Sequence, residues 1–198
     1  IVFGDWSSDV CSSDLVFAAA MRSLELRLAA KGGHTGWSRA WTACCFARAG
    51  RGNEALKHIE HLITDFATDS LLDLHPPRIF QIDGNLGGMA AVIEMLLQSY
   101  HGCIHLLPAL PEAWPEGSVR GLRARGGFGV DLSWTGGTLQ QATLRTTRGG
   151  LCRLRDPGQA FVIVDATGQS VAARREGGCL VFTAAPESPV VVRRRESP

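Results

Sequence analysis

The spacing of apolar residues changes period near Gly102, and this change constrains the fold of the 198-residue chain more than any other feature. Before Gly102, apolar residues recur at steps of three and four, as in "GWSRAWTACCFARAG", which indicates amphipathic helices. After it they alternate, most clearly in "FGVDLSW", and short apolar runs are separated by Gly, Pro, Asp and Ser. The sequence therefore predicts an α-then-β chain, with helices over residues 16–102 and a β-sandwich over residues 103–198.

The helical region predicts four helices joined by short glycine turns. The first covers Val16–Ala30, the second ends at Gly50, and Asn53 is expected to cap the third. The fourth helix, Leu86–Tyr100, is apolar on most of its faces, so we expect neighbouring helices to bury it on several sides. Four helices with a buried last member are typical of the closing part of a larger helical toroid.

The first fifteen residues show neither helical nor strand periodicity. The stretch "GDWSSDVCSSDL" is similar to a translated sequencing adapter, which indicates that residues 1–15 are an artefact rather than a natural flexible N-terminus. We therefore expect coding sequence upstream to be missing. The localisation is left open among extracellular, periplasmic and cytoplasmic.

Charge and cysteine content exclude several classes of partner. A net charge of +1 provides no field that would recruit nucleic acid or a membrane surface. The longest apolar stretch, Met89–Leu97, is interrupted by Glu94 and is far shorter than the roughly 20 residues that span a bilayer. The cysteines after residue 15 contain no CxxC pair, so we expect neither a zinc site nor a disulfide scaffold, and Cys44 and Cys45 are interpreted as buried thiols.

The stretch "LHPPRIFQIDGNLGGMAAVIEML" contains the main candidate for a functional residue, Asp83. Consecutive prolines hold the chain extended, and glycines that follow Asp83 allow tight turning before the fourth helix. In one interpretation, Asp83 or Asn85 caps that helix, and spacing alone favours this. In the other, Asp83 is a catalytic carboxylate on a loop at the mouth of a helical barrel.

Long motifs distinguish the two interpretations. The segments "HTGWSRAW", "LHPP", "QIDGNLGG", "AVIEMLLQS" and "IHLLPALPEAWPEGSVRGLRARGGFGVDLSW" are similar, in order and spacing, to the C-terminal part of glycoside hydrolase family 95, the inverting α-L-fucosidases. The resemblance covers residues 16–145 clearly and the later strands loosely. It implies the closing helices of an (α/α)6 barrel over residues 16–102, followed by a C-terminal β-sandwich domain. It also implies hydrolysis of α1,2-linked L-fucose without a metal or other cofactor.

The resemblance implies roles for individual residues. Asp83 matches the aspartate that works with upstream asparagines to activate water, and the general acid is an upstream glutamate. Asn85 and His75 are candidate sugar contacts. The common family spacing is the shorter "HPPFQIDGN", so the extra Arg78 and Ile79 leave a structural role for His75 equally open.

A second group of candidates lies in "HTGWSRAW". His34, Trp37 and Arg39 lie at or near a helix start and are expected to contact fucose, with a structural role as the open alternative. Trp41, one turn after Trp37, is expected in the core. Glu94 is interpreted as structural because it lies within a packed helix.

The sequence thus predicts a fragment of an α-L-fucosidase whose partner is a fucosylated oligosaccharide or glycan. We expect the fragment to be inactive alone because the acid is upstream. An α-L-galactosidase shares the same pocket chemistry. The alternative from another class is a non-catalytic carbohydrate-binding or structural β-domain fragment.

Overall fold

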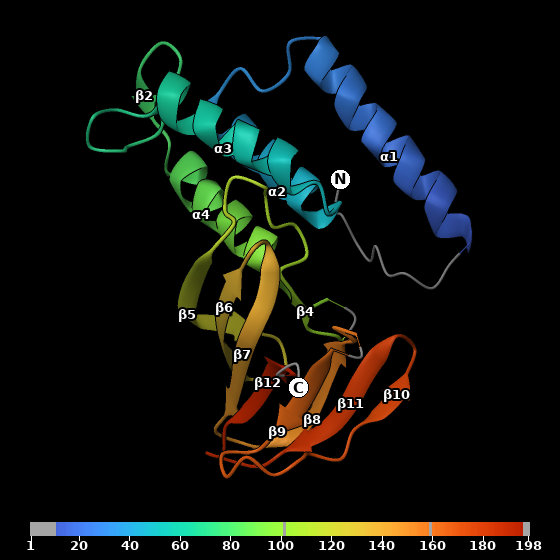
Figure 1. Cartoon of the computed structure of the whole chain (residues 1–198). Coiled ribbons are helices and arrows are strands. Elements are labelled where there is room, and N and C mark those ends of the chain that lie inside the picture. Colours follow the sequence, from blue (N-terminus) through green and yellow to red (C-terminus); the bar gives the residue numbers. More distant parts are fainter. Residues whose placement is uncertain (1–10, 101, 159, 196–198) are drawn as a thin grey trace. The chain divides into compact units, whose positions relative to one another are not determined.

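The computed structural model describes residues 11–100, 102–158 and 160–195, and it divides into two compact units, one up to Met95 and one from Leu96 (Figure 1). Helices are followed by strands in the chain, as predicted. Of the segment predicted to be adapter-derived, residues 1–10 lie outside the described residues.

The described part of the first unit contains four helices, α1 (Cys11–Ala29), α2 (Gly36–Arg48), α3 (Gly52–Phe66) and α4 (Ile82–Leu96). A hairpin of two short strands, β1 (Leu74–His75) and β2 (Ile79–Phe80), precedes α4. Within the described residues, no helix is long and apolar enough to cross a membrane.

Two predicted helix starts are wrong. α1 begins at Cys11 instead of Val16, so it includes residues of the segment predicted to be an artefact. α3 begins at Gly52 with Arg51 in the N-cap position, which places Asn53 inside the first turn instead of at the cap. The side chain of Arg51 instead donates through Nε to Glu54 Oε1 at 2.7 Å.

The fourth helix is also shifted from its prediction. α4 covers Ile82–Leu96 instead of Leu86–Tyr100, because Leu97 and Gln98 form β3, which pairs with β4 (His105–Leu106). The helix buries one face only. Four large apolar residues on it are exposed, namely Ile82 at 50%, Leu86 at 60%, Met89 at 65% and Ile93 at 40%.

α2 packs against α3 through small residues and one ring contact. Ala43 and Ala47 are fully buried, and the ring of Phe46 stacks on that of His58 with centroids 5.3 Å apart. Trp41 is half-buried instead of in the core, and the Arg27 guanidinium lies 5.2 Å from the centroid of its ring. Trp37 is 40% exposed.

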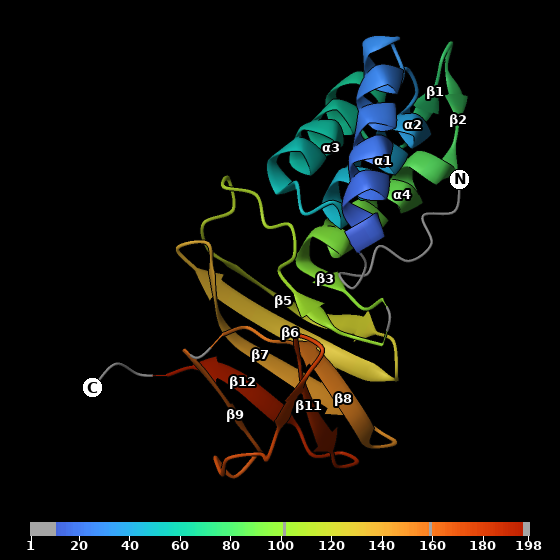
Figure 2. The same cartoon turned by 90° about the vertical axis from the view of Figure 1, so that its right-hand side faces the viewer.

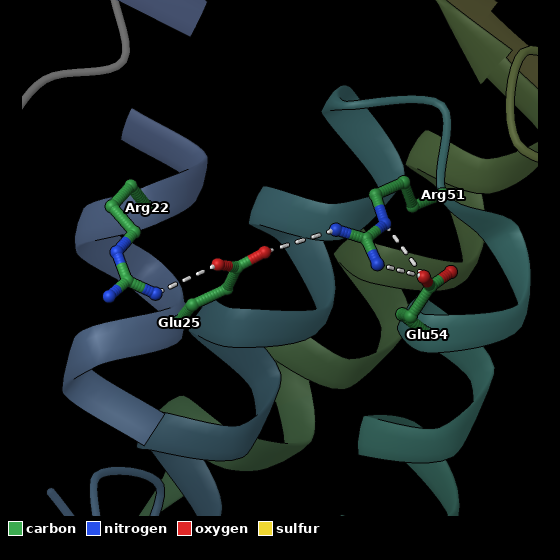
Figure 3. Close-up of polar contacts among 4 residues, drawn as sticks. All are labelled: Arg22, Glu25, Arg51 and Glu54. Carbon is green, nitrogen blue, oxygen red and sulfur yellow. Dashed lines mark hydrogen bonds and ion pairs between the residues drawn. The ribbon is translucent and has the colours of Figure 1, made fainter. Parts of the chain in front are cut away.

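Ion pairs connect α1 to α3 on the surface (Figure 3). Glu25 of α1 lies 3.6 Å from Arg22 on its own helix and 3.8 Å from Arg51, which in turn pairs with Glu54. Because these side chains are partly exposed, each pair contributes about 0–1 kcal/mol. In the same unit, Arg48 of α2 lies 3.4 Å from Glu94 of α4, which gives Glu94 a structural contact.

Besides the short β3–β4 pair, the described part of the second unit holds two larger antiparallel sheets (Figure 2). One has five strands in the order β5-β6-β7-β12-β9 and the other three strands in the order β10-β11-β8. The strands are β5 (Gly117–Ala124), β6 (Phe128–Thr135), β7 (Thr138–Thr146), β8 (Gly150–Arg155), β9 (Phe161–Val164), β10 (Arg174–Glu176), β11 (Cys179–Ala184) and β12 (Val190–Arg194).

The alternating pattern in β6 forms the core of the larger sheet as predicted. Phe128, Val130, Leu132 and Trp134 are all at most 6% exposed, whereas the residues between them are half-buried. The turn to β7 is made by Gly136 and Gly137, with φ of 59° and 68°. Both values lie in the left-handed region, where glycine is favoured over residues with a Cβ atom.

The expectation of no disulfide is wrong, because Cys103 and Cys179 are bonded within the second unit. They are 76 residues apart in the sequence, so their spacing gives no signal of the pairing. The prediction of buried thiols is confirmed for Cys45, whereas Cys44 is half-buried. Burial raises the pKa of Cys45 to about 12 and that of the half-buried Cys44 to about 11.

Candidate functional site

Asp83 lies on the first turn of α4, with an exposed side chain. An acidic residue at this position is favoured by the partial positive charge of a helix N-terminus. The helix begins before Asp83, and the N–H of Gly84 donates to the carbonyl of Gln81 at 3.3 Å. Asp83 is therefore a residue of the first turn instead of an N-cap.

Asn85 connects the start of α4 to the segment before the hairpin. Its Oδ1 accepts from the backbone N–H of Asp73 at 2.9 Å, and its Nδ2 donates to the carbonyl of Leu71 at 2.6 Å. The N–H of Gln81 also donates to the carbonyl of Asp73 at 3.0 Å. These bonds give Asn85 a bracing role, and its contact with a sugar stays a prediction.

His75 and the two inserted residues lie in the β1–β2 hairpin. His75 pairs with Ile79 in the antiparallel register, and the Pro76–Pro77 peptide bond at the tip is cis. The Nδ1 of His75 donates to the Pro76 carbonyl at 2.6 Å, because a carbonyl only accepts. In the neutral ring, this bond leaves Nε2 as an acceptor, and the ring is half-buried.

Asp73 is a central residue of the site that the sequence analysis missed. It is 1% exposed, and neither of its carboxylate oxygens has a hydrogen-bond partner in the described part of the chain. Burial raises its pKa, and the negative charge of Asp83 raises it further, while the nearby N–H groups of Leu74 and Gly84 act in the opposite direction. The available signal was an acidic residue inside the apolar run "LLDLH".

The carboxylate of Asp73 lies where the first turns of two helices meet. A Cβ atom placed on Gly36, the first residue of α2, or on Gly84 of α4 would overlap the carboxylate. The structure therefore brings the "HTGW" and "IDGN" motifs to one place, although they are far apart in the sequence. Thr35 caps α2, with its Oγ1 accepting from the N–H of Ser38 at 3.3 Å.

The remaining candidates lie around the start of α2. His34 is exposed immediately before the helix, and Trp37 is exposed on its first turn. Arg39 is half-buried, and its Nη1 lies 3.1 Å from Nδ1 of His58 on α3. His34 and Arg39 line an open groove of about 500 Å³ together with His58 and residues of α1 and α3, whereas Asp83 is not among its lining residues.

No group of three or more His, Cys, Asp or Glu residues in the described part of the chain is arranged to hold a metal ion. The polar groups at the candidate site are the carboxylates of Asp73 and Asp83, the Asn85 amide and the His75 imidazole. Such groups are suited to proton transfer and to hydrogen bonds with hydroxyls.

Two family models match the chain. "Glycosyl hydrolase family 95 catalytic domain" matches residues 6–96, and "Glycoside hydrolase family 95, C-terminal domain" matches residues 98–191. The first match begins inside the segment predicted to be adapter-derived. The two matches meet close to the division between the structural units.

Three curated relatives are similar to about half of the chain. "Alpha-L-fucosidase 2" of Arabidopsis thaliana is 41% identical over 116 residues, which are 52% of this chain and 14% of that protein. "Probable alpha-fucosidase A" of Aspergillus oryzae is 38% identical over 116 residues, 51% of this chain and 16% of the relative. The protein of the same name from Aspergillus niger is 35% identical over 115 residues, which are 51% of this chain and 14% of that protein. The matched region is thus a small part of each relative.

Proposed function

The chain belongs to glycoside hydrolase family 95, and we propose that it is the C-terminal part of an inverting α-L-fucosidase. One observation carries the proposal: models of the family's catalytic and C-terminal domains match successive parts of the chain. The relatives named as α-fucosidases support fucose as the sugar released. We refer below to the longer protein that would contain this chain as the parent enzyme.

In this proposal, the first unit supplies the closing helices of an (α/α)6 barrel and the second is a β-sandwich domain. The exposed stripe of Ile82, Leu86, Met89 and Ile93 on α4 supports the barrel, since these side chains would pack against its other helices. Strands with one buried face in two sheets support the sandwich.

Asp83 acts on the base side of a single displacement. Water attacks the anomeric carbon from the face opposite the leaving group, and its proton moves toward the base side while an acid protonates the glycosidic oxygen. Asp83, with upstream asparagines, orients and polarises that water. An upstream glutamate supplies the acid. The exposed position of Asp83 on a braced helix start supports this role.

The proposed sugar contacts differ in which of their side-chain groups remain available to a ligand. Nε2 of His75 accepts a hydrogen bond from a fucose hydroxyl, and the exposed ring of Trp37 stacks on the apolar face of the sugar. His34 offers an exposed imidazole just before the start of α2. Asn85 and Arg39 already bond to the protein, so they contribute to the pocket through any remaining hydrogen-bonding capacity.

Substitution of Asp83 in the parent enzyme tests its role. Asp83→Asn keeps the size of the side chain but removes the charge, so kcat on an aryl α-L-fucoside should fall at least about 100-fold, while Tm scarcely changes. A purely structural role at the helix start, through the partial positive charge of the helix N-terminus, instead predicts an unchanged kcat and a similar loss of stability, about 0.3–1 kcal/mol, for Asp83→Asn and Asp83→Ala. A fully active Asp83→Asn enzyme would remove Asp83 from the mechanism.

The overall proposal is tested by comparing the parent enzyme with the 198-residue chain. The parent should hydrolyse an α1,2-fucosylated trisaccharide and release the inverted anomer first, as followed by proton NMR. The chain alone should show no turnover, because loss of general acid catalysis typically costs about 100- to 10,000-fold and the pocket is incomplete. Robust turnover by the chain alone would refute the upstream acid. A preference for an aryl α-L-galactoside over the fucoside would identify the enzyme as an α-L-galactosidase.

Reading the gene upstream of residue 16 separates the enzyme from a binding fragment. Further barrel helices with the glutamate and asparagines would support the enzyme. A natural start codon near residue 16, together with fucoside binding and no hydrolysis, would instead support a carbohydrate-binding or structural fragment.

A further inference from the structure

The buried carboxylate of Asp73 lies against both helix starts of the site. We propose that Asp73 is the positioning residue for Asp83: its buried carboxylate holds the first turns of α2 and α4 together and fixes the backbone from which Asp83 projects. This inference rests on the function proposed above, because it assigns Asp73 an effect on the reaction that acts through Asp83.

The backbone bonds of Asp73 fall on both sides of Asp83. Its carbonyl accepts from the N–H of Gln81, two residues before Asp83, at 3.0 Å. Its N–H donates to the side chain of Asn85, two residues after Asp83, at 2.9 Å. A displacement of Asp73 therefore moves the helix turn that carries Asp83.

The side chain of Asp73 makes the third connection. The carboxylate lies against Gly36 and Gly84, and only glycine leaves room for it at both positions. It thereby joins the start of α2, which carries Trp37, to the start of α4, which carries Asp83. The proposed sugar contact and the proposed base-side residue are positioned by one side chain.

A carboxylate is a costly choice for a purely structural contact. Burial of a charge without hydrogen-bond partners is unfavourable, and a well-packed apolar side chain is often more stable in such a place. Two helix N-termini offset part of the cost through their partial positive charge. The charge of Asp83 acts on Asp73, so the two carboxylates interact, and a carboxyl group perturbed by burial and by a charged neighbour is typical of functional sites.

Kinetics of the parent enzyme test the inference through a double-mutant cycle. Asp73→Asn should lower kcat by about 10- to 100-fold, because a small misplacement of a reacting group has an effect of this size, and should leave KM within about twofold. In the Asp83→Asn background, Asp73→Asn should cause no further loss of kcat. Asp69→Asn, at an exposed carboxylate before the hairpin, is the matched control and should behave like wild type.

Three kinetic outcomes would overturn the inference. An unchanged kcat for Asp73→Asn would show that Asp83 is positioned without Asp73. Equal losses in both backgrounds would show that Asp73 does not act through Asp83. A rise in KM with unchanged kcat would make Asp73 a binding residue.

A titration of the 198-residue chain tests the interaction without activity and without changing Asp73. The side-chain carboxyl of Asp73 is followed by carbon NMR in the wild-type chain and in Asp83→Asn. Its apparent pKa should fall in the variant because the neighbouring negative charge is gone. An unchanged value would refute the interaction even if the parent is active. A shifted value with a parent that hydrolyses no fucoside would refute the proposed function alone.

Discussion

Protonation of His58 should destabilise the helical unit between neutral and mildly acidic pH. His58 is 7% exposed, stacks on Phe46 and lies with Nδ1 3.1 Å from Nη1 of Arg39. Because a guanidinium only donates, Nδ1 is the acceptor and the ring is neutral. Burial is the main cause that lowers the pKa of His58, and the charge of Arg39 adds to it, giving a value of about 4.

The sign of the effect follows from proton binding in the two states. Between the unfolded pKa of 6.5 and the folded pKa of about 4, the unfolded chain binds more protons at His58 than the folded chain. The stability contributed by the neutral ring is therefore present above about pH 6.5 and is lost as the pH falls toward about 4. At about 1.4 kcal/mol per pKa unit, the full difference is about 3 kcal/mol, of which about 2 kcal/mol is lost between about pH 7 and about pH 5.

Urea unfolding of the chain at both pH values measures this loss. The far-UV circular dichroism of the helices follows the first unit, where the described α-helices lie. Between about pH 7 and about pH 5, the free energy of unfolding of the wild-type chain should fall by about 2 kcal/mol more than that of His58→Gln, which has no imidazole to protonate. His34→Gln, at an exposed histidine, is the control and should lose as much as wild type. Equal losses for wild type and His58→Gln would refute the argument.

Three further predictions concern the two units separately. Limited proteolysis should leave the part after about Gly102, because α4 exposes apolar residues whereas the sheets have their own core; equal resistance of both parts in a monomer would contradict this. Cys103→Ser should lower the free energy of unfolding of the second unit by about 2–5 kcal/mol in denaturant titrations under oxidising conditions, whereas Cys44→Ser should leave that unit unchanged. Gly137→Ala should cost about 1 kcal/mol in the same assay, because φ is 68°, and Gly137→Asn should cost less; equal costs would reject the turn argument.

Local patterns in the sequence were sufficient to predict the strands that form most of the second unit. The alternation at Phe128, Val130, Leu132 and Trp134 is a property of one strand, so it predicts the buried face without knowledge of the partners. The alternation is weaker in β5, whose register with β6 shifts between Val119 and Leu122. The Cys103–Cys179 bond was missed because it depends on the pairing of distant strands.

The helical unit shows the limit of the same approach. Apolar composition predicted that α4 is buried on several sides, but burial depends on which neighbours are present, and four of its apolar residues are exposed among the described residues. The start of α4 was placed too late because Asp83 and Asn85 resemble caps, whereas Asn85 bonds back to Leu71 and Asp73. Motif resemblance predicted a functional role for Asp83, which the periodicity of the chain did not.

The two motif glycines are explained by a residue outside both motifs. Gly36 in "HTGW" and Gly84 in "IDGN" each lie on the first turn of a helix, where alanine is usually the better helix former. Their common neighbour is the carboxylate of Asp73, which a Cβ atom on either would overlap. The two helix starts thus give up intrinsic helix stability, and the site also bears the cost of a buried charge. Both costs have the same structural result, which is the packing of the starts of α2 and α4 against one side chain. The geometry of these two first turns, more than the stability of the unit, therefore accounts for the three residues together.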